Sequence, residues 1–346
     1  MFSSGIGPKE HLSRLGIPVI SNLRVGDNLQ EHVSSGIPFT MNASIGIDYL
    51  QTTSVQNILE YYITRNNSLT KNLDESTAFV KTKYNSPHDD WPDLQLNMMP
   101  GIFNCLPKAY LSLSRLFLSI GSLSTDFGLR LWKMQGLIKN VFTQVWKPYI
   151  GFNTFTIYAL VNRPKSRGWV RLKTPDPYDP PLIDPNLYAD EQDLNVLVEG
   201  LKFALKLGRT ESMKQWDVHP FQTSFPGCEH LTLYSDKYLR CVAKVYTTVG
   251  WHPCCSNKMG PKSDPTAVVD TQLRVRGVKG LRVVDASVMP SIISGNTNAP
   301  TIMIAEKVAD HMRGRRLKPF LPPMSEKVIR QLPHLEYELW DENLFL

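Results

Sequence analysis

The chain has 346 residues, of which 42% are hydrophobic, 20% charged and 10% aromatic. This composition excludes a disordered or fibrous protein, and the length allows two domains or interleaved parts of two. The formal net charge of +6 comes from 38 basic and 32 acidic residues spread along the sequence, so no nucleic-acid partner is expected. No uninterrupted apolar run reaches about 18 residues, so no membrane span is predicted.

The amino-terminal segment has the pattern of a domain interior. Gly7-Pro8 predicts the start of a short helix, Gly16 predicts its end, and the run IPVI at 17–20 predicts the start of a strand. The segment contains no basic region followed by an apolar run, so it does not match a signal peptide. We expect that further sequence precedes it.

Amphipathic helices and short strands are predicted from residue 32 to about residue 162. The stretches DLQLNMMP (93–100) and TFTIYALV (154–161) predict strands of one sheet. The segment 109–132 is rich in leucine and serine, and Arg115, Asp126 and Arg130 interrupt it. It predicts amphipathic helices over a core, with the lining of a substrate entrance as the alternative.

The second half of the chain contains two patterns that place polar residues beside regular structure. Asp190 and Asp193 precede a predicted helix at 194–208, whose apolar positions recur three and four apart and which Gly208 closes. The run LRVV at 281–284 predicts a buried strand followed at once by Asp285. A carboxylate at the carboxyl edge of a buried strand lies where ligand contacts concentrate in α/β sheets.

The stretch SGNTNAPTIMIAEK (294–307) predicts the beginning of a helix. Pro300 suits the first helical position and Asn298 suits the cap. The amino-terminal end of such a helix carries a partial positive charge and unpaired N–H groups, which suit developing negative charge. An ordinary well-capped core helix is the alternative. One face is expected to be buried, because apolar residues recur at helical spacing: Ile302, Ala305, Val308, Ala309 and Met312.

The chain has five cysteines, which is an odd number and includes one adjacent pair: Cys105, Cys228, Cys241, Cys254 and Cys255. This set fits neither a dense disulfide framework nor a zinc site. Cys228 and Cys241 are expected to form one bridge if the protein is exported. Two glycosylation triplets, beginning at Asn42 and Asn66, also favour export, so we expect an extracellular protein.

His252 is the histidine with the most informative neighbours. It lies between Trp251 and Pro253, and the proline restricts the backbone of His252 to extended geometry. The imidazole is therefore held in place, and it could serve as a general base near neutral pH. A histidine satisfied within the structure is the alternative, and the residues alone leave both open.

Three separate stretches, in order, resemble the glucose-methanol-choline (GMC) family of flavin oxidoreductases, with the pattern of its insect glucose dehydrogenase branch. Residues 251–310, beginning WHPCCSNKMG, resemble the carboxyl-terminal signature of the family. Residues 4–32, ending VGDNLQEH, resemble its second signature, and residues 162–194 match the start of its carboxyl-terminal region. The resemblance covers roughly residues 3–313.

The resemblance implies an α/β (α+β) fold with two parts. One is a partial FAD-binding domain formed by residues 1–33 and 250–316. The other is a substrate domain, residues 34–249, built on an antiparallel sheet with helices behind it. The tail, 317–346, shows no readable chemistry.

The resemblance also implies roles for individual residues. His252 occupies the position of the family's catalytic histidine, which takes the hydroxyl proton while the substrate carbon passes a hydride to flavin N5. Asn296 lies where the family has a second histidine or an asparagine, and its amide would bind the forming alkoxide. The expected FAD-binding residues are Trp251, Asp285, Ala286, Asn298, Ala299, Pro300, Thr301 and, in the loop 26–30, Asn28.

The chain departs from the family pattern in three places. Residues 254–257 are Cys-Cys-Ser-Asn where the family has a small turn containing glycine and one cysteine, and Leu23-Arg24 replaces the usual proline and glycine. The Gly-x-Gly-x-x-Gly strand and helix that hold the ADP half of FAD are absent. We therefore expect this sequence to be a piece of a longer FAD enzyme.

The function expected from the resemblance is FAD-dependent oxidation of CH–OH groups, with a small alcohol or sugar as the substrate partner. Oxygen, a quinone or another acceptor would take the electrons, and no metal is expected. A non-catalytic relative that keeps the fold as a binding or interaction module is the alternative. A secreted structural glycoprotein is a third reading, although it leaves His252 and Asn296 unexplained.

Overall fold

The computed structural model describes residues 1–43, 54–70, 76–100, 141–149 and 152–315. The predicted helices at 109–132, Cys105 and the tail at 317–346 lie outside these residues. Within the described residues, no helix is both long enough and apolar enough to cross a membrane.

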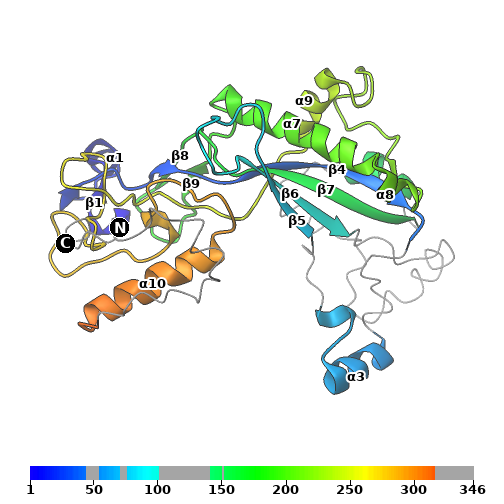
Figure 1. Cartoon of the computed structure of the whole chain (residues 1–346). Coiled ribbons are helices and arrows are strands. Elements are labelled where there is room, and N and C mark those ends of the chain that lie inside the picture. Colours follow the sequence, from blue (N-terminus) through cyan, green and yellow to red (C-terminus); the bar gives the residue numbers. More distant parts are fainter. Residues whose placement is uncertain (44–53, 71–75, 101–140, 150–151, 316–346) are drawn as a thin grey trace, which may run out of the picture.

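A six-stranded sheet forms one end of the molecule (Figure 1). Every strand pair in it is antiparallel, which confirms the antiparallel sheet predicted for this part. The predicted strands at 93–100 and 154–161 are both present in it, shifted by one residue at most at each end. In spatial order the strands are β10 (His219–Pro220), β4 (Val33–Met41), β7 (Asn153–Val161), β6 (Leu94–Pro100) and β5 (Ser76–Val80), and β11 (Thr248–Val249) also pairs with β4.

The helix α7 (Glu191–Gly208) packs across this sheet. Asp190 is its N-cap, and the Asp190 side chain accepts a hydrogen bond from the backbone N–H of Gln192. The apolar face of α7 is buried, as the sequence predicts. The contact is close at Gly200, where a Cβ would lie 2.6 Å from Cβ of Ala159 on β7. The helix begins three residues earlier than predicted, which places Asp193 in its first turn.

Asp193 attaches a loop to α7, and the predicted disulfide attaches a loop to a second helix. The Asp193 carboxylate accepts backbone hydrogen bonds from Lys165 and Ser166, both at 2.8 Å. Cys228 and Cys241 form the predicted disulfide, which joins a loop to the helix α9 (Asp236–Val245). The large core between sheet and helices draws its buried residues from 33–246.

A second, smaller core lies at the other end of the molecule (Figure 1). It joins the beginning of the chain to its last described part, since Ile6 and Val25 pack with Val268, Val275 and Val288. A three-stranded sheet connects it to the middle of the chain: β3 (Asp27–Leu29), β8 (Gly168–Arg171) and β9 (Leu182–Asp184). The other elements here are η1 (Phe2–Ser4), the parallel pair β1 (Ile6–Gly7) and β2 (Ser21–Asn22), α1 (Lys9–Arg14), η5 (Ala286–Val288) and α10 (Asn298–Met312).

The remaining elements are one helix of ten residues and several shorter helical segments. They are α3 (Val55–Thr64), η2 (Ser68–Thr70), the π-helical turn η3 (Phe142–Trp146), η4 (Lys147–Tyr149) and α8 (Glu211–Lys214).

Two strand predictions are wrong. The run 281–284 is no strand: Leu281 is 38% exposed, and only an isolated bridge joins Arg274 to Arg282. Gly277 and Gly280 both have a φ of 75° and turn the chain back within a few residues, which leaves no room for a longer ladder. The run 17–20 is also irregular, because Pro18 provides no N–H for a ladder, and the strand β2 begins after it.

The helix α10 exists, but its boundary and its burial differ from the prediction. It begins at Asn298 with Thr297 as N-cap, so Asn298 is not the cap and Pro300 is the third helical residue. None of its residues is buried. Ile304 and Val308 pack on the second core, whereas Ile302 is 51% and Met312 66% exposed. The expected buried face is therefore only half covered by the described residues.

Candidate active site

His252 is held by a short segment that continues the antiparallel pairing of β11 with β4. Gly250 follows β11 and donates its N–H to the carbonyl oxygen of His32 at 2.7 Å. A side chain does not fit here, because a Cβ on Gly250 would lie 2.8 Å from Nδ1 of His252 and 3.2 Å from Cβ of His32. The backbone N–H of His252 donates to both carboxylate oxygens of Glu31, at 2.8 and 3.0 Å. His252 is consequently only 9% exposed.

The turn after His252 pairs with the segment before β4. Gln30 and Cys254 exchange backbone hydrogen bonds, with N–O distances of 3.2 and 3.1 Å. Cys255 has a φ of 74°, a left-handed conformation that costs a non-glycine residue energy. The sulfur atoms of Cys254 and Cys255 lie 2.9 Å apart, and both residues are buried. The two stretches that stand out in the sequence, 26–32 and 251–257, thus form one unit.

The imidazoles of His252 and His32 face each other. Their Nδ1 atoms lie 2.9 Å apart, and the ring planes meet at 83°. Nε2 of His32 lies 3.0 Å from the carbonyl oxygen of Asn162 and 3.0 Å from that of Ile293. His32 is completely buried, and both of its ring nitrogens are occupied by these contacts.

The other nitrogen of His252 faces Asn296. Nδ2 of Asn296 lies 3.4 Å from Nε2 of His252, so residues 44 positions apart in the sequence meet in space. The side-chain oxygen of Asn296 lies 3.4 Å from Nε2 of Gln95, a buried residue of β6. Gln95 also donates to the side-chain oxygen of Asn97 at 2.9 Å. Strand β6 of the large sheet therefore contributes polar groups beside Asn296.

Burial sets the protonation of the groups around His252. It lowers the pKa of His252, and it lowers that of His32 to about 4, where the nearby charge of a protonated His252 acts in the same direction. Burial raises the pKa of Glu31 to about 7, against the opposing effect of the hydrogen bonds from the backbone N–H groups of His252 and His32. Both imidazoles are therefore neutral at pH 7.

The other residues expected to bind a cofactor lie on nearby surfaces. Trp251 is 59% exposed and has a φ of 60°. Asp285 is exposed, but its side chain also caps η5 by accepting from the N–H of Ser287 at 2.8 Å. Ala286, which follows Asp285, is half-buried. Nδ2 of Asn28 donates to the carbonyl oxygens of Cys255 and Pro290, so Asn28 ties the loop before β4 to the turn after His252.

The beginning of α10 follows Asn296 directly. The Thr297 side chain makes no capping hydrogen bond, and Asn298 and Ala299 are exposed. Pro300 carries no N–H, and the hydroxyl of Thr301 donates to the Thr297 carbonyl oxygen at 2.6 Å. The start of this helix therefore keeps its partial positive charge uncompensated by any capping side chain among the described residues.

The decisive comparison is with protein families. Residues 164–305 match the family model described as GMC oxidoreductase. This part of the chain is similar to GMC oxidoreductases. This result agrees with the resemblance of the three sequence stretches.

The proteins that the chain resembles include several named enzymes. It is 34% identical over 308 residues to glucose dehydrogenase (FAD, quinone) of Drosophila pseudoobscura pseudoobscura, which covers 88% of the chain and 43% of that protein. It is 33% identical over 329 residues to human mitochondrial choline dehydrogenase, with 90% and 45% covered. It is 32% identical over 307 residues to ecdysone oxidase of Bombyx mori, with 89% and 41% covered. The chain thus spans less than half the length of these relatives.

Solved structures show the same fold. A formate oxidase variant of Aspergillus oryzae superposes with a TM-score of 0.65 at 22% identity, covering 90% of this chain and 51% of that one. An FAD-dependent oxidoreductase from Chaetomium thermophilum gives a TM-score of 0.59 at 25% identity, covering 90% and 52%. The mixed α and β architecture with antiparallel sheets is therefore the GMC fold.

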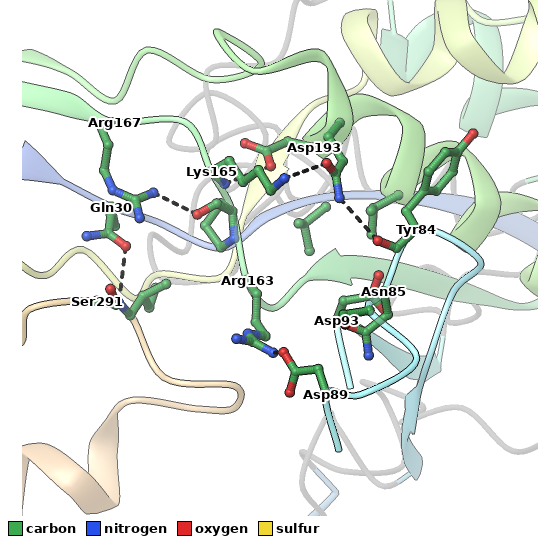
Figure 2. A pocket seen from close by; sticks show the side chains of 16 residues that line it. Gln30, Tyr84, Asn85, Asp89, Asp93, Arg163, Lys165, Arg167, Asp193 and Ser291 are labelled. Carbon is green, nitrogen blue, oxygen red and sulfur yellow. Dashed lines mark hydrogen bonds and ion pairs between the residues drawn. The ribbon is translucent and has the colours of Figure 1, made fainter. Parts of the chain in front are cut away.

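A cavity of about 360 Å³ lies outside the group around His252 (Figure 2). Three basic residues line it, and each has a partner. Arg163 pairs with Asp89, Lys165 donates to Gln192, and Arg167 donates to backbone carbonyl oxygens. Neither His252 nor Asn296 lines this cavity. We assign no role to this cavity.

The sequence reasoning singles out His252 and Asn296 but misses three of their neighbours. Gln95 had a readable signal, because it alternates with apolar Leu94 and Leu96 in a predicted strand, which marks a polar face of the sheet. Glu31 and His32 had a weaker one, as the end of a family signature. Their contacts with His252 depend on the fold and cannot be derived from spacing.

Proposed function

We propose that the protein containing this chain is an FAD-dependent oxidoreductase that oxidises CH–OH groups of small alcohols or sugars, with His252 as the base. One observation carries the proposal: Nε2 of His252 and the amide of Asn296 meet at 3.4 Å beside the uncapped start of α10. The names of the relatives support the substrate class. A glucose dehydrogenase and a choline dehydrogenase are among them, and both glucose and choline carry CH–OH groups.

His252 would accept the hydroxyl proton of the substrate at Nε2. Burial lowers its pKa, so the imidazole is neutral at pH 7 and has a lone pair to accept with. General base catalysis of this kind contributes about 10² to 10⁴-fold to the rate.

Asn296 would bind the substrate oxygen as negative charge develops on it. Its Nδ2 group has two N–H bonds, and the contact with His252 uses at most one of them. The second can donate to the substrate oxygen, which would also orient the C–H bond.

The residues around this pair fit a flavin. The exposed indole of Trp251 offers an apolar surface, and the exposed first turn of α10 offers N–H groups and a partial positive charge. Bound FAD supplies the acceptor for the hydride. The start of α10 would stabilise nearby negative charge by about 0.3–2 kcal/mol. The residues proposed to hold FAD are Asn28, Trp251, Asp285, Ala286, Asn298, Ala299, Pro300 and Thr301.

The domain division and the location of the protein are further parts of this proposal. The separate cores support a flavin-side part, 1–33 and 250–316, and a substrate-side part, 34–249. The Cys228–Cys241 disulfide supports an extracellular location, because such bonds persist in oxidising compartments.

The test is anaerobic reduction of the flavin by added alcohol or sugar in the purified whole protein. The absorption of oxidised flavin should bleach on addition of substrate. His252→Ala should lower kcat by about 10² to 10⁴-fold and keep the flavin content, because the base alone is removed. His219→Ala, at an exposed histidine outside the site, is the matched control. Equal turnover in His252→Ala and the control would end the assignment.

A further inference from the structure

The hydrogen-bond partners of His32 determine which of its ring nitrogens carries the hydrogen. Nε2 of His32 faces two backbone carbonyl oxygens, those of Asn162 and Ile293, each at 3.0 Å. A carbonyl oxygen only accepts hydrogen bonds, so Nε2 must carry a hydrogen. His32 is completely buried at the start of β4, and burial keeps it neutral at pH 7.

The proton on His32 determines the proton on His252. In a neutral imidazole one nitrogen donates and the other accepts, so Nδ1 of His32 is an acceptor. Nδ1 of His252 lies 2.9 Å away and must therefore donate to it. Since His252 is also neutral, its Nε2 is left with a lone pair.

The other side of His252 leads to the same assignment. Nε2 of His252 faces Nδ2 of Asn296, which can only donate. The orientation of the Asn296 amide agrees with this assignment, because its oxygen faces the donor Nε2 of Gln95 at 3.4 Å. All hydrogen bonds from Gln95 through Asn296 and His252 to His32 thus run in one direction.

Glu31 holds the two histidines at this spacing. Its Oε1 accepts from the backbone N–H of His32 at 2.8 Å and from that of His252 at 2.8 Å. One buried carboxylate therefore binds both backbones, although they are 220 residues apart in the sequence. This contact keeps the imidazoles within hydrogen-bond distance.

We propose that His32 is a positioning residue that holds His252 in the tautomer protonated at Nδ1, so that Nε2 carries the lone pair that can accept a proton. The catalytic meaning of this tautomer rests on the proposed function, but the tautomer itself does not. His32 reaches the substrate side only through His252, so its effect is on orientation and proton position.

The experiment uses two variants that each keep one half of the His32 contacts. In His32→Asn, the side-chain oxygen is as many bonds from the backbone as Nδ1, so an acceptor for His252 remains. In His32→Gln, the side-chain nitrogen is as many bonds away as Nε2, so the donor to Asn162 and Ile293 remains while the acceptor for His252 is lost. The protein is labelled with isotopic nitrogen at histidine, and long-range proton–nitrogen correlation spectra report the tautomer of each imidazole.

We expect His252 to be protonated at Nδ1 in the unaltered protein and in His32→Asn. In His32→Gln the form protonated at Nε2 should appear. Protonation of His252 at Nε2 in the unaltered protein would overturn the proposal, and so would an unchanged tautomer in a folded His32→Gln protein. The spectra of the unaltered protein suffice if a variant does not fold.

Turnover separates this proposal from the proposed function. In flavin-loaded protein, kcat should fall further in His32→Gln than in His32→Asn at equal flavin content. If the tautomers are as expected but His252→Ala has normal turnover, the role of His32 stands and the role of His252 as the base fails.

Discussion

The two ends of the molecule differ in how far each covers its own apolar surface. At the sheet end, Phe39, Phe155 and Leu201 are almost completely buried between β4, β7 and α7. At the other end, α10 has no buried residue, and Met303 is 53% exposed. The sheet end therefore covers its apolar surface more completely than the end that contains α10, and His252 lies where the two ends meet.

Truncation of a core side chain should give the largest difference in unfolding free energy between the two ends. Phe39 is completely buried and stacks on Phe155 with ring centroids 5.1 Å apart. Phe39→Ala should lower the free energy of unfolding by about 3–5 kcal/mol through lost transfer energy and a cavity. Met303→Ala, on α10, should change it by less than about 0.5 kcal/mol. Equal losses in chemical denaturation would contradict the comparison.

Acid titration tests the junction between the two ends. The pKa of Glu31 rises from 4.5 to about 7 on folding, so the folded state binds more protons in this window and stability falls as pH rises through it. The pKa of His32 falls from 6.5 to about 4, so the unfolded state binds more protons there and stability rises with pH. The contributions of Glu31 and His32 to the pH dependence of the free energy of unfolding therefore largely cancel between pH 4.5 and 6.5.

Glu31→Gln should reveal the contribution of His32 to the pH dependence of the free energy of unfolding. Without the carboxyl, stability should rise by roughly 3 kcal/mol from pH 4 to 6.5, since one unit of pKa shift is worth about 1.4 kcal/mol. Denaturant midpoints measured across this range check it. If the free energy of unfolding of Glu31→Gln changed with pH as little as that of the unaltered protein, His32 would not be held neutral.

A methyl group at Gly250 tests how tightly the junction is packed. In Gly250→Ala the new Cβ would meet Nδ1 of His252 at 2.8 Å, so the imidazole must move. We expect a loss of about 1–3 kcal/mol in unfolding free energy, as for other overpacked sites. Gly295→Ala is the control, because no atom lies within 4 Å of its Cβ position. Similar histidine spectra for Gly250→Ala and the unaltered protein would argue against the close contact.

The smallest effect is expected at the helix caps. Asp190 caps α7 through its side chain, whereas the Thr297 side chain makes no such bond at α10. Asp190→Ala should cost about 0.5–2 kcal/mol, and Thr297→Ala less than that. Thermal unfolding of the two variants measures the difference, and the reverse order would show that α10 depends on its cap.

Local patterns predict the sheet end better than the end that contains α10. The strands at 93–100 and 154–161 and the helix after Asp190 are predicted because their apolar residues follow the period of a strand or helix and are buried accordingly. The run 281–284 has the composition of a buried strand but lies between tight turns, and α10 has an apolar face that the described residues leave half exposed. Composition alone does not reveal either circumstance.

The candidate site is predicted in part. His252 and Asn296 enter through the family resemblance, and the fold brings them to 3.4 Å. Glu31 and His32 are found only from the structure, because their roles depend on contacts over more than 200 residues of sequence. Such pairs lie beyond the reach of any pattern within a short window.

The bond between Cys228 and Cys241 has a practical consequence for producing the protein. It closes a loop that leads into α9, whose Tyr238, Leu239 and Val242 fill the large core. In a reducing host cytosol this link would be open, at a cost of about 2–5 kcal/mol for a native disulfide. The choice of expression compartment therefore determines how much folded material any of these measurements can draw on.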